Sequence, residues 1–141
     1  MTFLLDTNVI SEMVKPRPNA GLLGWLADAD VDRTFLSVIT LLELRYGVER
    51  MNAGHKRTRL EDWLDHDLPA RFEGRILAIE AKIADVCGRL VARSEAVGRP
   101  VETRDGLIAA TAEVLGLTLV TRNVSDFEPI VEEIVNPWNL A

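Results

Sequence analysis

The sequence predicts an α/β fold in which helices cover both faces of a central parallel sheet. Short apolar stretches of strand length alternate with longer stretches of helical periodicity along the whole chain. The chain has 141 residues, 48% of them hydrophobic and 27% charged, a length and composition that favour one compact core over two. No internal repeat, linker or low-complexity segment interrupts the pattern. We therefore expect a single domain over residues 1–141 with a three-layer α/β/α arrangement.

The first quarter of the chain contains two predicted strands and two predicted helices. Leu4-Leu5 is a short apolar run that ends at Asp6, as expected of a buried strand. A short helix over residues 9–14 stops before two prolines, which remove backbone donors. A second helix has an apolar face at residues 22–26, and a second strand is expected at residues 34–37.

The middle of the chain is predicted to be mainly helical. Thr40 and Glu43 have the spacing of a capping box, so we expect a helix to begin at Thr40 and to end before Gly54. A charged helix follows over residues 55–68. A third strand is expected at residues 75–79.

The last third alternates helix and strand again. Apolar residues recur at helical spacing over residues 83–91, within a long helix. Thr103 is the expected N-cap of the next helix, and Gly116 marks its end. Residues 117–121 have the clearest strand pattern of the chain, and residues 130–135 are expected to add an edge strand.

Charge and cysteine content restrict the classes of function. The 16 Lys and Arg residues against 22 Asp and Glu residues give a formal net charge of -6, so bulk attraction does not draw this chain to nucleic acid. Contact with a polyanion requires a local reversal of sign, from a bound divalent cation or a basic patch. The single cysteine, Cys87, cannot form an internal disulfide. Neither a signal peptide nor a run of ~20 apolar residues is apparent, so we expect a cytoplasmic protein without membrane contact.

Four acidic residues fall where the carboxyl ends of parallel strands are expected to meet. Asp6 follows the first strand, and Glu43 lies near the start of the helix after the second strand. Asp105 lies in the first turn of a later helix, and Asp126 lies in the loop after the strand that ends at Thr121. Ligands of open parallel sheets bind at this edge.

A cluster of carboxylates is costly, because like charges repel each other and burial adds to the penalty. Folds tolerate such clusters mainly where a hard cation neutralises them, and Mg²⁺ or Mn²⁺ suits oxygen ligands. Such a metal ion activates water and clamps a phosphodiester for in-line displacement. The pattern therefore indicates metal-dependent phosphodiester chemistry.

Each carboxylate also has a purely structural interpretation. Glu43 is the second half of the predicted capping box, and Asp6 caps the helix that follows it. Asp105 and Asp126 are acids that a helix dipole favours near its N-terminus. The combination of four favours the metal site, and Asp6 is the hardest to explain otherwise, because it interrupts an apolar run that needs no charge.

The segments around these carboxylates resemble the four motifs of PIN-domain proteins. In chain order they are LLDTNVIS at 4–11, LLELRYG at 41–47, DGLIAATA at 105–112 and TRNVSDF at 121–127. Their order and spacing resemble most specifically the VapC toxins of bacterial toxin–antitoxin pairs, in the FitB-like branch. One departure is Arg104, which places a positive charge beside the third motif.

The resemblance implies a Mg²⁺- or Mn²⁺-dependent endoribonuclease with a PIN-like α/β/α fold. It implies a homodimer, an RNA substrate and a VapB-type antitoxin that fills the active site, with promoter DNA bound only through the antitoxin. It also implies roles for individual residues: Asp6 and Asp105 as the principal metal ligands, Glu43 and Asp126 as the rest of the acidic shell, directly or through water, and Thr7, Asn8, Thr121 and Asn123 as the residues that orient these carboxylates.

Two alternatives stay open. The same metal chemistry would serve a PIN-type nuclease that acts on DNA. A non-catalytic subunit of a toxin–antitoxin complex that binds its promoter would also retain the fold.

The remaining conspicuous residues have mainly structural interpretations. A basic edge could guide an RNA backbone, although a solvated helix face is the preferred interpretation of its members: Arg45, Arg50, Lys56, Arg57 and Arg59. We expect surface positions for His55 and His66. Cys87, Trp25 and Trp63 are expected to be core or packing residues, and Trp138 is expected to anchor the C-terminus.

Overall fold

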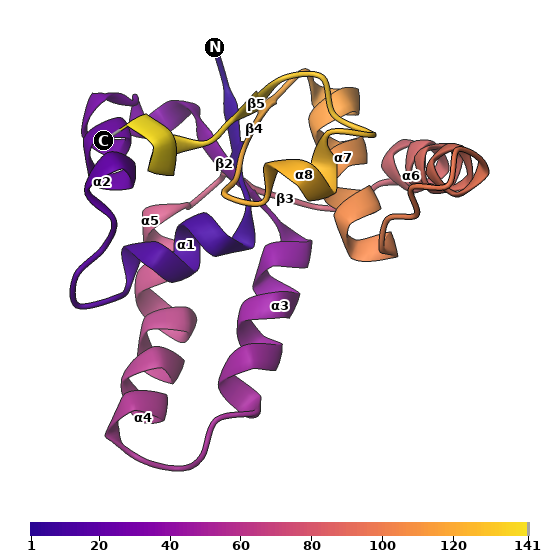
Figure 1. Cartoon of the computed structure of the whole chain (residues 1–141). Helices are drawn as coiled ribbons and strands as arrows, with labels where there is room; N and C mark the ends of the chain where they lie inside the picture. Colours follow the sequence, from indigo (N-terminus) through magenta and orange to yellow (C-terminus); the bar gives the residue numbers. More distant parts are fainter. Residues whose placement is uncertain (141) are drawn as a thin grey trace.

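Five parallel strands form the centre of the molecule, in the spatial order β3-β2-β1-β4-β5 (Figure 1). The structure is a computed structural model and describes residues 1–140; Ala141, the last residue of the predicted domain, lies outside the described residues. The strands are β1 (Phe3–Leu5), β2 (Thr34–Ser37), β3 (Ile76–Leu77), β4 (Thr118–Val120) and β5 (Ile134–Val135). All four neighbouring pairs are parallel, which confirms the predicted α/β class.

Helices connect the strands and cover both faces of the sheet (Figure 1). The α-helices are α1 (Thr7–Met13), α2 (Ala20–Asp28), α3 (Val38–Glu49), α4 (His55–Asp62), α5 (Leu68–Arg71), α6 (Ala81–Ala96), α7 (Thr103–Leu115) and α8 (Val124–Phe127). Shorter 3-10 segments are η1 (Val31–Arg33) and η3 (Pro137–Leu140), and the segment η2 (Trp63–Asp67) is a π-helix. Helices α3 and α4 form an antiparallel pair that projects from the sheet (Figure 1).

The core has two parts, one on each face of the sheet. Successive residues of a strand point to opposite faces, so Leu4 of the central strand lies in one cluster and Leu5 in the other. The first cluster contains buried residues of α6 and α7, among them Ile83, Leu90 and Ile108. The second contains residues of α1, α2 and the segment after α5, among them Ile10, Leu22 and Phe72. This division is the three-layer arrangement that the sequence predicts.

The start of α3 differs from the prediction. Ser37, not Thr40, is the N-cap, and its hydroxyl accepts a hydrogen bond from the backbone N–H of Ile39 at 3.0 Å. Glu43 consequently lies beyond the first turn, and the predicted capping box does not form. Thr40 is instead fully buried, with its hydroxyl 3.2 Å from that of Thr7.

Several other boundaries are shifted by a few residues. The charged helix predicted over residues 55–68 continues through the π-helix to Arg71. Thr103 is the first residue of α7, and Glu102 takes the N-cap position that was expected of Thr103. Gly116 ends α7 as expected, with φ 66° in the left-handed region that glycine favours.

The sheet order places β1 and β4 side by side, and this pairing positions the first and fourth motifs. The backbone N–H of Asp6 donates to the carbonyl of Val120 at 2.9 Å, so Asp6 and Thr121 leave the sheet at neighbouring points. The carboxyl ends of these strands therefore meet at one edge, as the prediction requires. Within residues 1–140, the helices are all too short or too polar to cross a membrane.

Candidate active site

Asp6 stands at the centre of this edge and is held by three hydrogen-bond donors. It caps α1, and its Oδ1 accepts a hydrogen bond from the backbone N–H of Thr7 at 2.8 Å. Its Oδ2 accepts from Asn8 Nδ2 at 3.0 Å and from Thr121 Oγ1 at 2.8 Å. Only 6% of the residue is exposed. Both interpretations of Asp6 are therefore compatible: it is a helix cap, and it is a fixed carboxylate at the ligand-binding edge.

The donors of Asp6 are themselves fixed by a second set of hydrogen bonds. Thr121 is fully buried, and its Oγ1 accepts from Asn8 Nδ2 at 3.1 Å and from the backbone N–H of Asn123 at 3.0 Å. Asn8 Oδ1 accepts from the backbone N–H of Arg122 at 3.1 Å, which determines the orientation of the amide. Asn123 therefore acts through its backbone N–H in this network.

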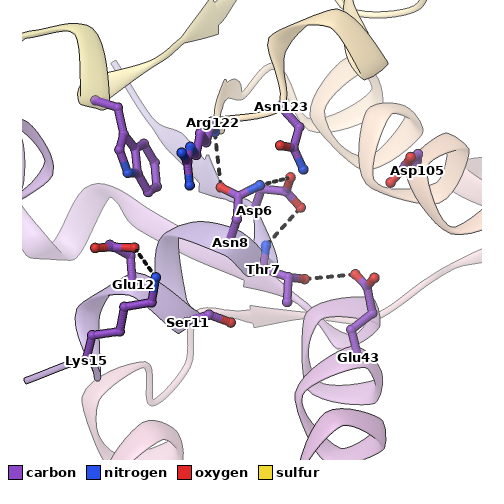
Figure 2. Close-up of a pocket in the computed structure, with 11 residues that line it drawn as sticks. Asp6, Thr7, Asn8, Ser11, Glu12, Lys15, Glu43, Asp105, Arg122 and Asn123 are labelled. Atoms are coloured by element: carbon purple, nitrogen blue, oxygen red, sulfur yellow. Dashed lines mark hydrogen bonds and ion pairs between the residues drawn. The ribbon is translucent and has the colours of Figure 1, made fainter. Parts of the chain in front are cut away.

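Glu43 reaches the same edge from α3. Thr7 Oγ1 donates a hydrogen bond to Glu43 Oε1 at 2.8 Å (Figure 2). Arg104 Nη1 lies 3.9 Å from the other oxygen, Oε2. The arginine that departs from the family pattern thus lies against the acidic group, at a distance where it offsets part of the charge of Glu43.

Asp105 is placed by the packing of α7 against α6. The next residue, Gly106, is buried where α6 comes closest: a Cβ atom at this position would lie 2.8 Å from Val91 Cγ2 and 3.0 Å from Cys87 Sγ. The absence of a side chain at Gly106 allows this approach and so fixes the first turn of α7, which carries Asp105.

Three of the four predicted carboxylates line one pocket. Asp6, Glu43 and Asp105 border a cavity of about 370 Å³ (Figure 2). Asp126 does not line it; it is exposed on α8 and, with Asp105, borders an adjacent cavity of about 500 Å³. Asp105 thus forms the boundary between the two cavities.

The carboxylates of this cluster repel one another, and this repulsion contributes to raised pKa values. Burial, and after it the charges of Asp6, Asp126 and Glu43, raise the pKa of Asp105 to about 6. Burial also raises the pKa of Asp6, although the hydrogen bonds from Thr121, Thr7 and Asn8 oppose the rise. The cluster therefore carries an electrostatic penalty that a cation would remove.

The donor set fits a hard divalent cation, but the spacing does not form a closed ligand shell. Within residues 1–140, no group of three or more Asp, Glu, His or Cys side chains lies close enough together to hold a metal ion. Mg²⁺ typically binds one or two carboxylates and keeps several waters, so an open arrangement of oxygen ligands suits it.

Five residues that line the same cavity as the carboxylates were not predicted as site residues. They are Ser11 and Glu12 of α1, Lys15 just after that helix, Arg122, and Trp138 of η3. Asn8 and Glu12 are four residues apart, a helical spacing that places them on one face of α1 and that the sequence already contains, whereas Lys15 follows the end of that helix at Met13. Nothing in the sequence indicates that Arg122 and Trp138 share a cavity.

The other residues singled out from the sequence lie outside this cavity. His55 and His66 are exposed, and Cys87 is buried in the core, which raises the pKa of its thiol. Trp25 packs edge-on against Phe3, and Trp63 packs against the second core cluster.

Two residues of the basic edge are paired with acids. Arg57 forms ion pairs with Glu49 and Glu61, and Arg45 with Asp65. These pairs favour the interpretation as a solvated helix face.

Comparison with known proteins identifies the class. The PIN domain family matches residues 3–128, so the chain belongs to the PIN-domain family, whose nucleases generally use divalent metal ions. The VapC ribonuclease Y4jK of Sinorhizobium fredii is 36% identical over 138 residues, which are 98% of this chain and 99% of that protein. The toxin FitB of Neisseria gonorrhoeae is 36% identical over 136 residues, 96% of this chain and 98% of that protein.

The fold supports a narrower grouping. The crystal structure of FitAcB from Neisseria gonorrhoeae superposes with a TM-score of 0.91 at 36% identity, and the match covers 99% of this chain and 100% of that one. Within the PIN-domain family, the chain therefore belongs with the VapC ribonucleases and the toxin FitB, as the four motifs indicate.

Proposed function

We propose that this chain is the toxin of a type II toxin–antitoxin pair, an endoribonuclease that hydrolyses RNA phosphodiester bonds with Mg²⁺ or Mn²⁺. The observation that carries the proposal is the convergence of Asp6, Glu43 and Asp105 on one pocket, in a chain that is similar to VapC ribonucleases over nearly its whole length. Metal-dependent cleavage of phosphodiester bonds follows from membership of the PIN-domain family. The particular ion, Mg²⁺ or Mn²⁺, and the RNA substrate are proposals.

The chain's own residues would divide the work as follows. Asp6 and Asp105 are the proposed direct ligands, because Asp6 is fixed by three donors and Asp105 carries the largest penalty without a counterion. Glu43 and Asp126 would complete the acidic shell, directly or through water. A bound divalent ion would supply an activated water and neutralise charge on the phosphodiester. Thr7, Asn8 and Thr121 would keep the carboxylates in place as substrate enters.

We also propose that the chain acts in the cytoplasm as a single domain over residues 1–141 and assembles as a homodimer. Leu42 and Tyr46, one helical turn apart on α3, are each about half exposed and offer an apolar surface for a second copy. A VapB-type antitoxin would fill the pocket, and the net charge of -6 supports binding of promoter DNA through the antitoxin only.

Cleavage of RNA by the purified chain tests this function. We expect cleavage of total bacterial RNA with Mg²⁺ or Mn²⁺, loss of cleavage in EDTA, and loss in Asp6→Asn and Asp105→Asn. Asp85→Asn, an exposed position on α6, is the matched control and should cleave normally. Cleavage that survives EDTA and both site variants would refute the proposal.

The two alternatives are separated by parallel assays. Equal or faster cleavage of a DNA of the same sequence would favour the DNA nuclease. Absence of any cleavage, together with promoter binding by the antitoxin complex, would favour the non-catalytic subunit.

A further inference from the structure

The active-site pocket has a second half that the proposed metal chemistry does not use. Besides its carboxylates, it is lined by Lys15, Arg122 and Trp138. In Figure 2, Glu12 and Lys15 lie on the opposite side of Asp6 from Asp105. The pocket thus has an acidic end, which continues past Asp105 into the adjacent cavity, and a cationic end.

Lys15 is held in position by the buried carboxylate of Glu12. Only 8% of Glu12 is exposed, and its Oε1 accepts a hydrogen bond from Lys15 Nζ at 2.9 Å while its Oε2 accepts from the backbone N–H of Asn19 at 2.9 Å. The side chain of Lys15 itself is 57% exposed, so the ammonium retains free donors toward the solvent side of the pocket.

Arg122 is positioned at both its backbone and its side chain. Its backbone N–H donates to Asn8 Oδ1, and the amide of Asn8 donates to Asp6, so Arg122 is one residue removed from the proposed metal carboxylate. Its guanidinium carbon lies 5.8 Å from the centre of the Trp138 ring, within the range of a cation–π contact. Trp138 is half-buried against the second core cluster, which makes it a firm support.

The charges of this end sum to one net positive charge, because Glu12 offsets one of the two cations. A guanidinium and an ammonium facing solvent are the groups that bind phosphate oxygens in proteins. A strand whose scissile phosphate lies at the carboxylates must place neighbouring phosphates along the pocket.

We propose that Arg122 and Lys15 bind a backbone phosphate of the RNA strand next to the one that is cleaved, with Glu12 and Trp138 as the residues that position them. This inference rests on the proposed function, because it takes RNA as the strand. It predicts that the chain binds RNA through a small number of local contacts in spite of its acidic surface.

Binding of end-labelled total bacterial RNA to the Asp105→Asn form, measured by filter retention in Mg²⁺ over a range of salt concentrations, tests the proposal without cleavage. Loss of one phosphate contact should lower the slope of log K against log salt by about 0.7. Because Arg122 and Lys15 share one phosphate, we expect Arg122→Gln and Lys15→Gln each to lower the slope by part of this amount and the double variant to lower it by about 0.7. Arg93→Gln, the same charge change at an exposed position of α6, should leave the slope unchanged.

Trp138→Leu separates positioning from direct contact. The arginine remains but loses its support, so we expect weaker binding with an unchanged salt slope. In the cleaving wild-type background, Arg122→Gln should raise KM about tenfold with kcat within about twofold, as expected of a group that binds the strand away from the reacting phosphate.

The outcomes distinguish this inference from the proposed function. If the wild type cleaves RNA while Arg122→Gln and Lys15→Gln match Arg93→Gln in slope and KM, the phosphate site is refuted and the nuclease stands. Failure of the Asp105→Asn form to retain any RNA also refutes the phosphate site. If the wild type does not cleave, the proposed function fails by its own assay.

Discussion

Replacement of Asp105 by asparagine should stabilise the metal-free protein, even though it should abolish activity. In the folded protein, burial and the charges of Asp6, Asp126 and Glu43 raise the pKa of Asp105 from 3.8 to about 6. In the unfolded chain these charges are far away and the pKa is close to its ordinary value. The ionised form of Asp105 therefore opposes folding, and Asp105→Asn removes that charge while it keeps the size of the side chain.

The sign and the pH range follow from the two pKa values. A carboxyl group with a raised folded-state pKa holds its proton more tightly when folded, so stability falls as pH rises through the interval between about 4 and 6. A shift of about two units corresponds to about 3 kcal/mol, and solvent screening of this half-buried group reduces it to about 1–2 kcal/mol. Asp105→Asn should regain this free energy at pH 8 and almost none at pH 4.

Thermal unfolding in EDTA at pH 4 and pH 8 measures the effect. We expect Asp105→Asn to raise Tm by about 3–6 °C at pH 8. Asp85→Asn, which removes an exposed carboxylate that pairs with Arg89, is the control and should change Tm little at either pH. Added Mg²⁺ should stabilise the wild type and not Asp105→Asn. An equal Tm for both chains at pH 8 in EDTA would show that the carboxylates do not repel each other as described.

Three further substitutions test the framework of the site and core, each by urea unfolding. Thr121→Val removes the hydroxyl that donates to Asp6 and should cost about 1–3 kcal/mol and weaken stabilisation by Mg²⁺, whereas Thr121→Ser should retain most of both. Gly106→Ala should cost about 1–3 kcal/mol because its Cβ would collide with α6, while Gly88→Ala, with open space around it on α6, should stabilise by about 0.5–1 kcal/mol. Phe72→Ala, at a fully buried position, should cost about 3–5 kcal/mol; a loss below 1 kcal/mol would contradict the assigned core.

The elements that the sequence predicts well are those whose signal is local. Each predicted strand is present, and the apolar runs at Leu4-Leu5 and residues 117–121 are of strand length and too short for a separate helix. The positions of Asp6 and Asp105 relative to helix starts follow from the same local pattern. Their meeting in one pocket could be anticipated because a parallel sheet places all its carboxyl ends at one edge.

The start of α3 shows where local signals mislead. Thr40 and Glu43 have the spacing of a capping box, but the helix begins three residues earlier, at a serine that ends β2. Glu43 is then free to accept a hydrogen bond from Thr7, a residue 36 positions away. The role of Glu43 therefore depends on a tertiary contact, and it cannot be inferred from residues 40–43 alone.

The cationic half of the pocket could not be predicted from the sequence, for a related reason. Trp138 belongs to a 3-10 turn that packs against α2, and Arg122 follows β4, so their contact depends on how the end of the chain returns across the molecule. Only Glu12 has a usable sequence signal, because it shares a face of α1 with Asn8; Lys15 lies beyond the end of that helix.

The acidic and cationic halves of the pocket together explain how a chain with a net charge of -6 can bind a polyanion. An acidic chain needs a local reversal of sign to hold a polyanion, and the sequence allowed either a metal ion or a basic patch. The structure offers a position for both within one cavity, and they are not equivalent. A divalent ion at the carboxylates would mainly offset their own repulsion, which leaves Arg122 and Lys15 as the groups whose charge is directed at the strand. Few phosphate contacts imply a shallow salt dependence, so discrimination among RNAs would depend on the shape of the pocket more than on its charge.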